Sequence, residues 1–119
     1  MTVQSLNQDV HWVTPTRSTY HSLFPKEGLL AVGNVGLDYR AQNGQGFIQI
    51  PWEDVQHIYV QMFFKGRYIR AIDVLTEDDQ HFEFIVKDPK ITLKEIRKHL
   101  DRSKFSARQG NLATLFKRK

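Results

Sequence analysis

Residues 62–68 hold the densest group of side chains that could contact another molecule. The group places three aromatic rings and two cations around a glycine: Phe63, Phe64, Lys65, Gly66, Arg67 and Tyr68. Because successive strand residues point to opposite faces, Phe63 and Phe64 cannot both enter one core. An exposed ring beside cations fits a protein surface, a lipid interface or a nucleic-acid base. The alternative is a sheet covered on both faces, with the N-terminal segment over the second.

Five histidines raise the question of a metal site. No two of them have the i, i+4 spacing of a helical ligand pair, and the chain has no cysteine. His81 and Glu83 share one face of an expected strand, but a zinc site needs three or four ligands in a set geometry. We therefore expect ordinary surface or half-buried histidines, and no metal or other cofactor.

Catalytic motifs are absent from the sequence. It contains no nucleophile elbow, no glycine motif for dinucleotides and no phosphate-binding loop. Two pairs of acids, Glu53 with Asp54 and Asp78 with Asp79, fall in expected turns. Structural roles fit them better than acid–base chemistry, so we expect a protein that is not an enzyme.

Length and composition predict one domain of 119 residues with a core of its own. The absence of cysteine excludes disulfides and thiolate sites. The first residues lack the charged start and apolar run of a secretory signal. No stretch approaches the roughly 20 apolar residues of a membrane-spanning helix. The expected localisation is cytoplasmic.

The formal net charge of +4 is concentrated in the last third of the chain. Residues 87–119 carry eleven basic side chains and three acidic ones. This asymmetry indicates an anionic partner, although a solvated helix face would have the same pattern. Lys117, Arg118 and Lys119 are the candidate contacts for a membrane or another anion.

Short β-prone segments precede one helix. Strands are expected over residues 10–14, 29–32, 35–39, 46–50, 55–64, 68–75 and 81–86. Pro15 and Pro51 are expected to end strands, because proline has no backbone donor. Gly33-Asn34 and Asn43-Gly44 predict tight turns, and Trp52 after Pro51 is interpreted as a core anchor, with recognition at a sheet edge as the alternative.

The helix signal begins at Asp88, expected as N-cap, with Pro89 in the first turn. Leu93, Ile96 and Leu100 follow at spacings of three and four, which makes one apolar stripe.

Strands followed by one helix predict an α+β fold, a bent antiparallel sheet or split barrel of about seven strands capped by a C-terminal helix. Pleckstrin-homology-like and GRAM-like domains have this order of elements. We expect a single domain over residues 1–103. Residues 104–119 are expected to form a basic tail, with a short amphipathic helix over 111–116 as an alternative.

Several ordered segments resemble one bacterial family: Ser5-Leu6-Asn7, residues 48–55 (IQIPWEDV), residues 64–69 (FKGRYI), residues 87–90 (KDPK) and Ile96-Arg97-Lys98. The family is the small group often called ManO, whose genes accompany operons for mannose-type sugar phosphotransferase transporters in Gram-positive bacteria. The resemblance implies a cytoplasmic accessory or regulatory protein with a pleckstrin-homology-like fold. It carries over no catalytic residue.

The function expected from these observations is a non-enzymatic regulatory module that binds a protein partner. The resemblance implies a subunit of the mannose transporter as that partner. The expected contact residues are those of the aromatic hairpin tip: Phe63, Phe64, Lys65, Arg67 and Tyr68. The alternative is a nucleic-acid-binding regulator of the sugar operon that acts through the basic C-terminal region, although no helix-turn-helix signature precedes the helix. Homo-oligomerisation through a sheet edge is compatible with either function.

Overall fold

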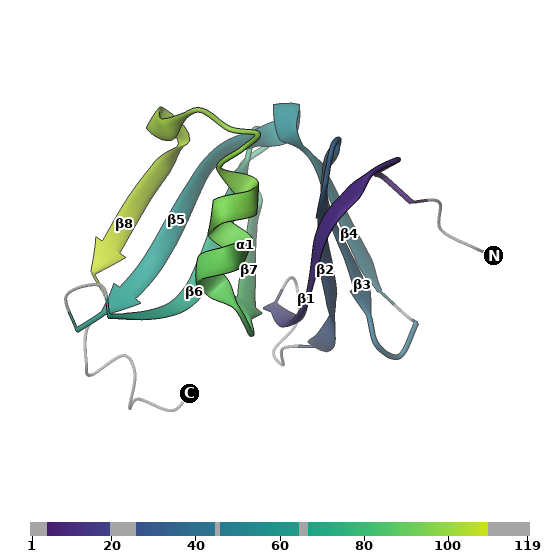
Figure 1. Ribbon diagram of the computed structural model, residues 1–119, viewed down its shortest axis with the longest axis horizontal. Helices are drawn as coiled ribbons and strands as arrows, with labels where there is room; N and C mark the ends of the chain where they lie inside the picture. Colours follow the sequence, from purple (N-terminus) through teal and green to yellow (C-terminus); the bar gives the residue numbers. More distant parts are fainter. Residues whose placement is uncertain (1–4, 20–25, 45, 65–66, 110–119) are drawn as a thin grey trace.

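The computed structural model describes residues 5–19, 26–44, 46–64 and 67–109. These residues form one bent sheet of eight strands in the order β4-β3-β2-β1-β7-β6-β5-β8, and helix α1 lies across the opening between its two halves (Figure 1). The elements are β1 Val10–Thr19, β2 Lys26–Gly33, β3 Gly36–Ala41, β4 Phe47–Pro51, η1 Trp52–Asp54, β5 Val55–Phe63, β6 Tyr68–Thr76, β7 His81–Val86, α1 Pro89–Ile96, η2 Arg102–Lys104 and β8 Phe105–Gln109. The α+β class predicted from the sequence is confirmed.

The sheet differs from the prediction in strand number and direction. We expected about seven antiparallel strands, but β8 adds an eighth, which runs parallel to β5 with Ile58 opposite Phe105. A parallel pair needs a long crossover connection, and α1 with η2 supplies part of it. The sheet therefore continues past Ser103 into the segment expected to be a tail. The amphipathic helix considered for residues 111–116 lies outside the described residues.

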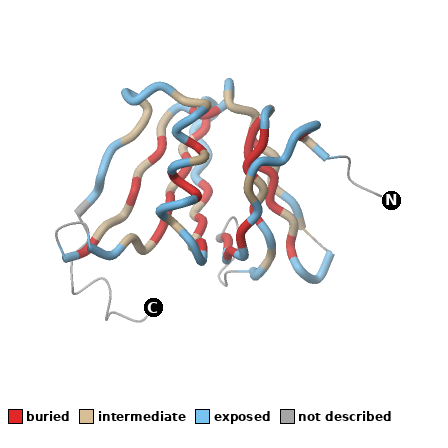
Figure 2. The backbone as a smooth tube through the Cα atoms, viewed as in Figure 1, coloured by how far each residue is buried: buried red, intermediate tan, exposed pale blue. Residues whose placement is uncertain are grey.

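The core fills the space enclosed by the bent sheet and α1. Alternating residues of β5, β6 and β7 are buried, and so are Leu93 and Ile96 of the helix stripe (Figure 2). The helix ends at Ile96, earlier than the stripe predicted, and Leu100 packs against the core from the segment that follows. Asp88 is the N-cap residue and Pro89 starts the helix, as expected, but the Asp88 side chain makes no cap hydrogen bond.

Strand β1 runs through Pro15 to Thr19, whereas we expected it to end at Pro15. The Pro15 carbonyl accepts a bond from the Lys87 amide, just beyond the last residue of β7. In a strand, the N–H and C=O of one residue point to the same side. The missing donor of Pro15 therefore faces away from β2, and the β1–β2 ladder continues through the Pro15–Leu29 pair.

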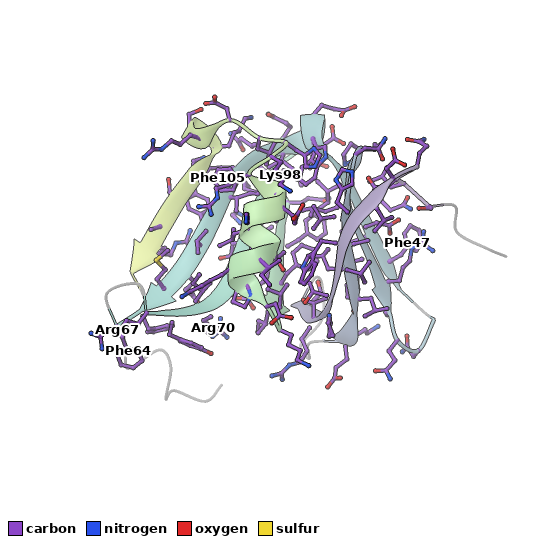
Figure 3. The ribbon with its side chains drawn as sticks, viewed as in Figure 1. Phe47, Phe64, Arg67, Arg70, Lys98 and Phe105 are labelled. Atoms are coloured by element: carbon purple, nitrogen blue, oxygen red, sulfur yellow. The ribbon has the colours of Figure 1, made fainter. Side chains whose placement is uncertain are left out.

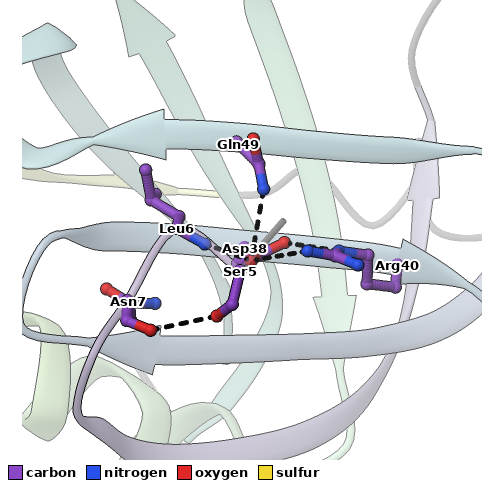
Figure 4. A network of polar contacts seen from close by, with 6 residues as sticks. All are labelled: Ser5, Leu6, Asn7, Asp38, Arg40 and Gln49. Atoms are coloured by element: carbon purple, nitrogen blue, oxygen red, sulfur yellow. Dashed lines mark hydrogen bonds and ion pairs between the residues drawn. The ribbon is translucent and has the colours of Figure 1, made fainter. Parts of the chain in front are cut away.

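The N-terminal segment is tied to the β2–β3 hairpin by Asn7. Its Oδ1 atom accepts hydrogen bonds from the amides of Val35 (2.7 Å) and Gly36 (2.9 Å). A Cβ atom at Gly33 would lie 2.3 Å from Asn7 Cγ, so glycine there lets the side chain dock. Figure 4 shows the neighbouring contacts, in which the Leu6 amide donates to Asp38 Oδ2 over 3.1 Å.

Three rings stack where the helix end meets the two halves of the sheet. His99 lies between His11 and Trp52, with ring centroids 5.4 and 4.8 Å away. Trp52 Nε1 donates to the Gly33 carbonyl over 3.0 Å, and its ring packs against the core as an anchor. Burial lowers the pKa of His99, and His11 beside it lowers that pKa further; Glu95 acts in the opposite direction and Lys98 in the same one.

We predict that the folded protein loses stability in mild acid through His99. Burial disfavours the imidazolium in the folded state, so the unfolded chain binds the proton more readily. The loss begins below the ordinary value of 6.5 and continues as the pH falls through the lower folded pKa. Urea unfolding at pH 7.5 and 5.5 measures it. His99→Phe, which keeps a ring in the stack, should have a shallower pH dependence, and an unchanged dependence would show that His99 is not the cause.

Candidate functional site

The β5–β6 hairpin ends in the aromatic tip predicted from the sequence, where Phe63 pairs with Tyr68. Phe63 is 1% exposed, whereas Phe64 is 52% and Tyr68 45% exposed. As expected, only one of the two phenylalanines is buried. Phe63, which we expect from the sequence as a contact residue, is instead buried, and its ring contacts those of Phe64 and Tyr68.

Phe64 has an unusual backbone conformation for an aromatic residue. Its φ of 54° lies in the left-handed region, which glycine adopts without strain and other residues adopt at a cost of roughly 1–2 kcal/mol. The Phe64 carbonyl accepts a bond from the Arg67 amide over 3.2 Å, which closes the turn. The tip thus presents an exposed ring at a position where folding alone favours glycine.

A groove of about 520 Å³ runs from this tip to the start of α1. Residues 67–70 and 85–91 line it, and we call it the tip groove. Strand β6 begins where the antiparallel β7 ends, so the tip and the β7–α1 junction meet at one end of the sheet. Figure 3 shows Phe64, Arg67 and Arg70 together at this end, and Lys98 at the opposite end of the helix.

Positive charge dominates the tip groove. Its basic residues are Arg67, Arg70, Lys87 and Lys90, and Asp88 is the acidic residue of its lining. Arg70 is held in place by Glu83 at 3.1 Å and by Gln61 at 2.8 Å. Tyr68 and Ile91 add exposed apolar surface at 45% and 44% exposure. An arrangement of fixed cations beside apolar surface can bind an anionic, partly apolar ligand.

Sequence reasoning missed the second half of this groove. The sequence places Lys87 and Lys90 in a basic C-terminal third, but the fold brings them into one groove with Arg67. The sequence could have indicated this, because β6 and β7 are consecutive strands. If they form an antiparallel pair, the end of β7 must lie beside the first residues of β6. Lys65, Lys117, Arg118 and Lys119 lie outside the described residues, so their predicted contacts stay predictions.

A polar cluster on the outer face of β5, β6 and β8 is structural. Arg108 of β8 lies over the Tyr59 ring at 4.5 Å and pairs with Asp73 of β6 at 3.4 Å. His57 and Ser106 share a hydrogen bond of 2.7 Å. Burial raises the pKa of Asp73, and Glu83 adds to the rise. These contacts fasten β8 to the sheet. In the described part of the chain, no group of three or more His, Asp or Glu side chains could hold a metal ion.

The structure is a small α+β domain with a groove lined mainly by basic and apolar residues. The chain belongs to the family described as Domain of unknown function (DUF956), whose model matches residues 2–119. A search of curated proteins gives no match. Among solved structures, the chain is similar to the C-terminal domain of an unknown protein from Leishmania infantum. The two share 12% identity with a TM-score of 0.64, over 76% of this chain and 82% of the other, which shows likeness of fold.

The helices in the described residues include none that is long and apolar enough to cross a membrane.

Proposed function

We propose that this protein is a non-enzymatic accessory module that binds a protein partner through Phe64, Arg67, Tyr68 and the adjoining tip groove. The observation that carries the proposal is Phe64 itself. The residue carries a large apolar ring, is 52% exposed and adopts a left-handed backbone. Both features cost free energy in the free protein. A contact that buries the ring in a complex supplies the compensation.

The other segments that carry the family resemblance have roles in folding. Asn7 ties down the N-terminus, Trp52 packs against the core, and Pro89 begins the helix. The exposed residues of the tip have no comparable role. This contrast supports the tip as the functional part of the pattern.

The partner we propose is a subunit of a mannose-type sugar phosphotransferase transporter, met at the cytoplasmic face of the membrane. The resemblance to the ManO family supports this choice, and the bent sheet closed by a helix supports a pleckstrin-homology-like assignment of the fold. Membrane contact through Lys117, Arg118 and Lys119 would keep the protein near such a partner, at about 1 kcal/mol per basic residue. Homo-oligomerisation through a sheet edge is compatible with this role.

Nucleic-acid binding has weaker support than protein binding. The helix turns its apolar stripe, Leu93 and Ile96, to the core. Lys94 of the helix, with Arg97 and Lys98 just after it, therefore forms a solvated face, and Lys98 pairs with Glu95 at 3.1 Å.

Affinity capture from native membranes tests the proposal. The native chain should recover a membrane-transporter subunit, while Phe64→Gly and Arg67→Glu should recover at most about a tenth as much, which corresponds to a loss of at least about 1.4 kcal/mol of binding free energy. Phe64→Gly is informative because relief of the left-handed strain offsets the entropy of glycine. Its free energy of unfolding should stay within about 0.5 kcal/mol of the native value.

Arg102→Glu is the matched control for charge. Arg102 is exposed in η2, at the other end of β5 from the tip (Figure 1), and its variant should recover the partner as the native chain does. Equal recovery by Phe64→Gly would contradict the tip as the contact surface. Absence of any membrane protein from the native capture would contradict the proposed partner, and a salt-dependent mobility shift with operon DNA would then favour the nucleic-acid alternative.

A further inference from the structure

A second groove adjoins the tip groove across the end of β7. It has a volume of about 770 Å³ and is lined by residues 15–17, 27–29, 40–42 and 85–87. Residues 85–87 also line the tip groove. The two hollows therefore meet at Ile85, Val86 and Lys87, and we call them together the joint groove. It crosses five neighbouring strands, β3, β2, β1, β7 and β6.

Basic side chains prevail along the whole joint groove. The six basic residues of the lining are Arg17, Arg40, Arg67, Arg70, Lys87 and Lys90. The acidic ones are Glu27 and Asp88. Arg40 is fixed by Asp38, with Nε to Oδ1 at 2.9 Å, as Arg70 is by Glu83. Lys87 stands at the junction of the two hollows, where it can reach a ligand in either.

Exposed apolar side chains also line the joint groove. Seven large hydrophobic residues are exposed in the described part of the chain. Three of them, Leu29, Tyr68 and Ile91, line the joint groove. Leu29 is 52% exposed and lies beside Pro15 and Arg40 in the strand register. Cations and apolar surface thus alternate along one hollow.

We infer that the joint groove binds an acidic segment of the protein partner, in extended conformation, with apolar side chains between its carboxylates. The inference rests on the proposed function and names the chemistry of the partner. Five strands at ~4.8 Å spacing give a contour of about 19 Å, or about six residues of extended chain at ~3.3 Å each. Carboxylates would pair with the rim cations, and apolar side chains would cover Leu29, Ile85 and Tyr68.

The shape and lining favour a peptide over other anions. A bilayer surface is flat on this scale, so it would contact cations on a protruding part of the protein. The cations here line a hollow, and the hollow also contains the acidic residue Glu27. A nucleic-acid backbone offers phosphates but no apolar groups for Leu29 and Ile91, and Tyr68 is the one aromatic residue of the lining.

Fluorescence anisotropy with the full chain and a labelled peptide of about eight residues, alternating Glu and Leu, tests the inference; the length exceeds the estimated six residues. Lys87→Glu at the junction should weaken binding about tenfold, because an attraction becomes a repulsion. Leu29→Ser should weaken it by a similar factor through lost apolar contact. Lys98→Glu, the same charge change at the far end of the helix, should leave binding unchanged. A peptide with Gln in place of Glu should bind at least tenfold more weakly.

Equal binding by Lys87→Glu and Lys98→Glu would overturn the inference, and so would anionic vesicles that bind in a Lys87-dependent manner while the peptide does not bind. This test and the test of the proposed function can fail independently of each other. A membrane partner captured through Phe64, with no effect of Lys87→Glu or Leu29→Ser, would leave the proposed function standing and remove the groove. Peptide binding that depends on Lys87, with no partner captured, would support the groove and contradict the proposed function. Thermal unfolding of each variant shows that the fold is kept.

Discussion

Replacing Phe84 with alanine should lower the free energy of unfolding by about 3–5 kcal/mol, the largest effect we expect from a single substitution. Phe84 is 1% exposed and lies in β7, between Ser18 of β1 and Ile72 of β6. Its ring centroid is 6.1 Å from that of Tyr39 of β3. The side chain therefore joins the two halves of the sheet, and its removal leaves a cavity that neither half can fill alone.

Urea unfolding followed by circular dichroism measures this loss. Phe64→Ala is the matched control, since it removes the same ring from an exposed position, and we expect a change within about 0.5 kcal/mol. If Phe84→Ala proved as stable as Phe64→Ala, the contact between the two halves would not be the centre of the core.

Replacing Asn7 with alanine should cost about 2–3 kcal/mol, although Asn7 belongs to no strand or helix. The side chain is 6% exposed, and its Oδ1 accepts from two amides, those of Val35 and Gly36. Alanine would leave both amides without this acceptor, and a buried donor without a partner loses its full solvation. The hairpin turn between β2 and β3 should loosen first, because this segment holds it from the outside.

Ser5→Ala provides the control for the Asn7 prediction. The exposed Ser5 hydroxyl donates to the Asn7 carbonyl over 3.0 Å, and its loss should change stability by no more than about 0.5 kcal/mol (Figure 4). Hydrogen exchange at the Val35 and Gly36 amides gives a second readout, since both should exchange faster in Asn7→Ala than in Ser5→Ala. Unchanged protection of these amides would contradict the role given to Asn7.

Local sequence patterns predicted the elements well where a residue type restricts the backbone. Asn43-Gly44 forms the predicted turn between β3 and β4, in which Gly44 adopts a φ of 76°. Pro89 begins α1 one residue after Asp88. The alternation of faces in residues 55–64 predicted that Phe63 and Phe64 would not both be buried. Each of these features depends on φ restrictions or on strand periodicity, which act within a few residues.

The same reasoning failed where a remote neighbour decides. Pro15 should end a strand, but β7 stops at Val86 and leaves the missing donor without consequence. Residues 105–109 have one large apolar side chain, Phe105, and become a strand because β5 offers an open edge. Such pairings depend on backbone groups rather than on side-chain pattern, so the local sequence does not encode them.

The candidate site divides in the same way. That rings and cations meet at residues 62–68 follows from the chain, because they are neighbours in it. The burial of Phe63 comes from packing, and so does the placement of Arg17, Arg40, Lys87 and Lys90 with Arg67 along the joint groove. Antiparallel pairing of β3, β2, β1, β7 and β6 places these side chains at neighbouring positions across the sheet. Because these residues lie far apart in the chain, only the pairing of distant strands brings them close together.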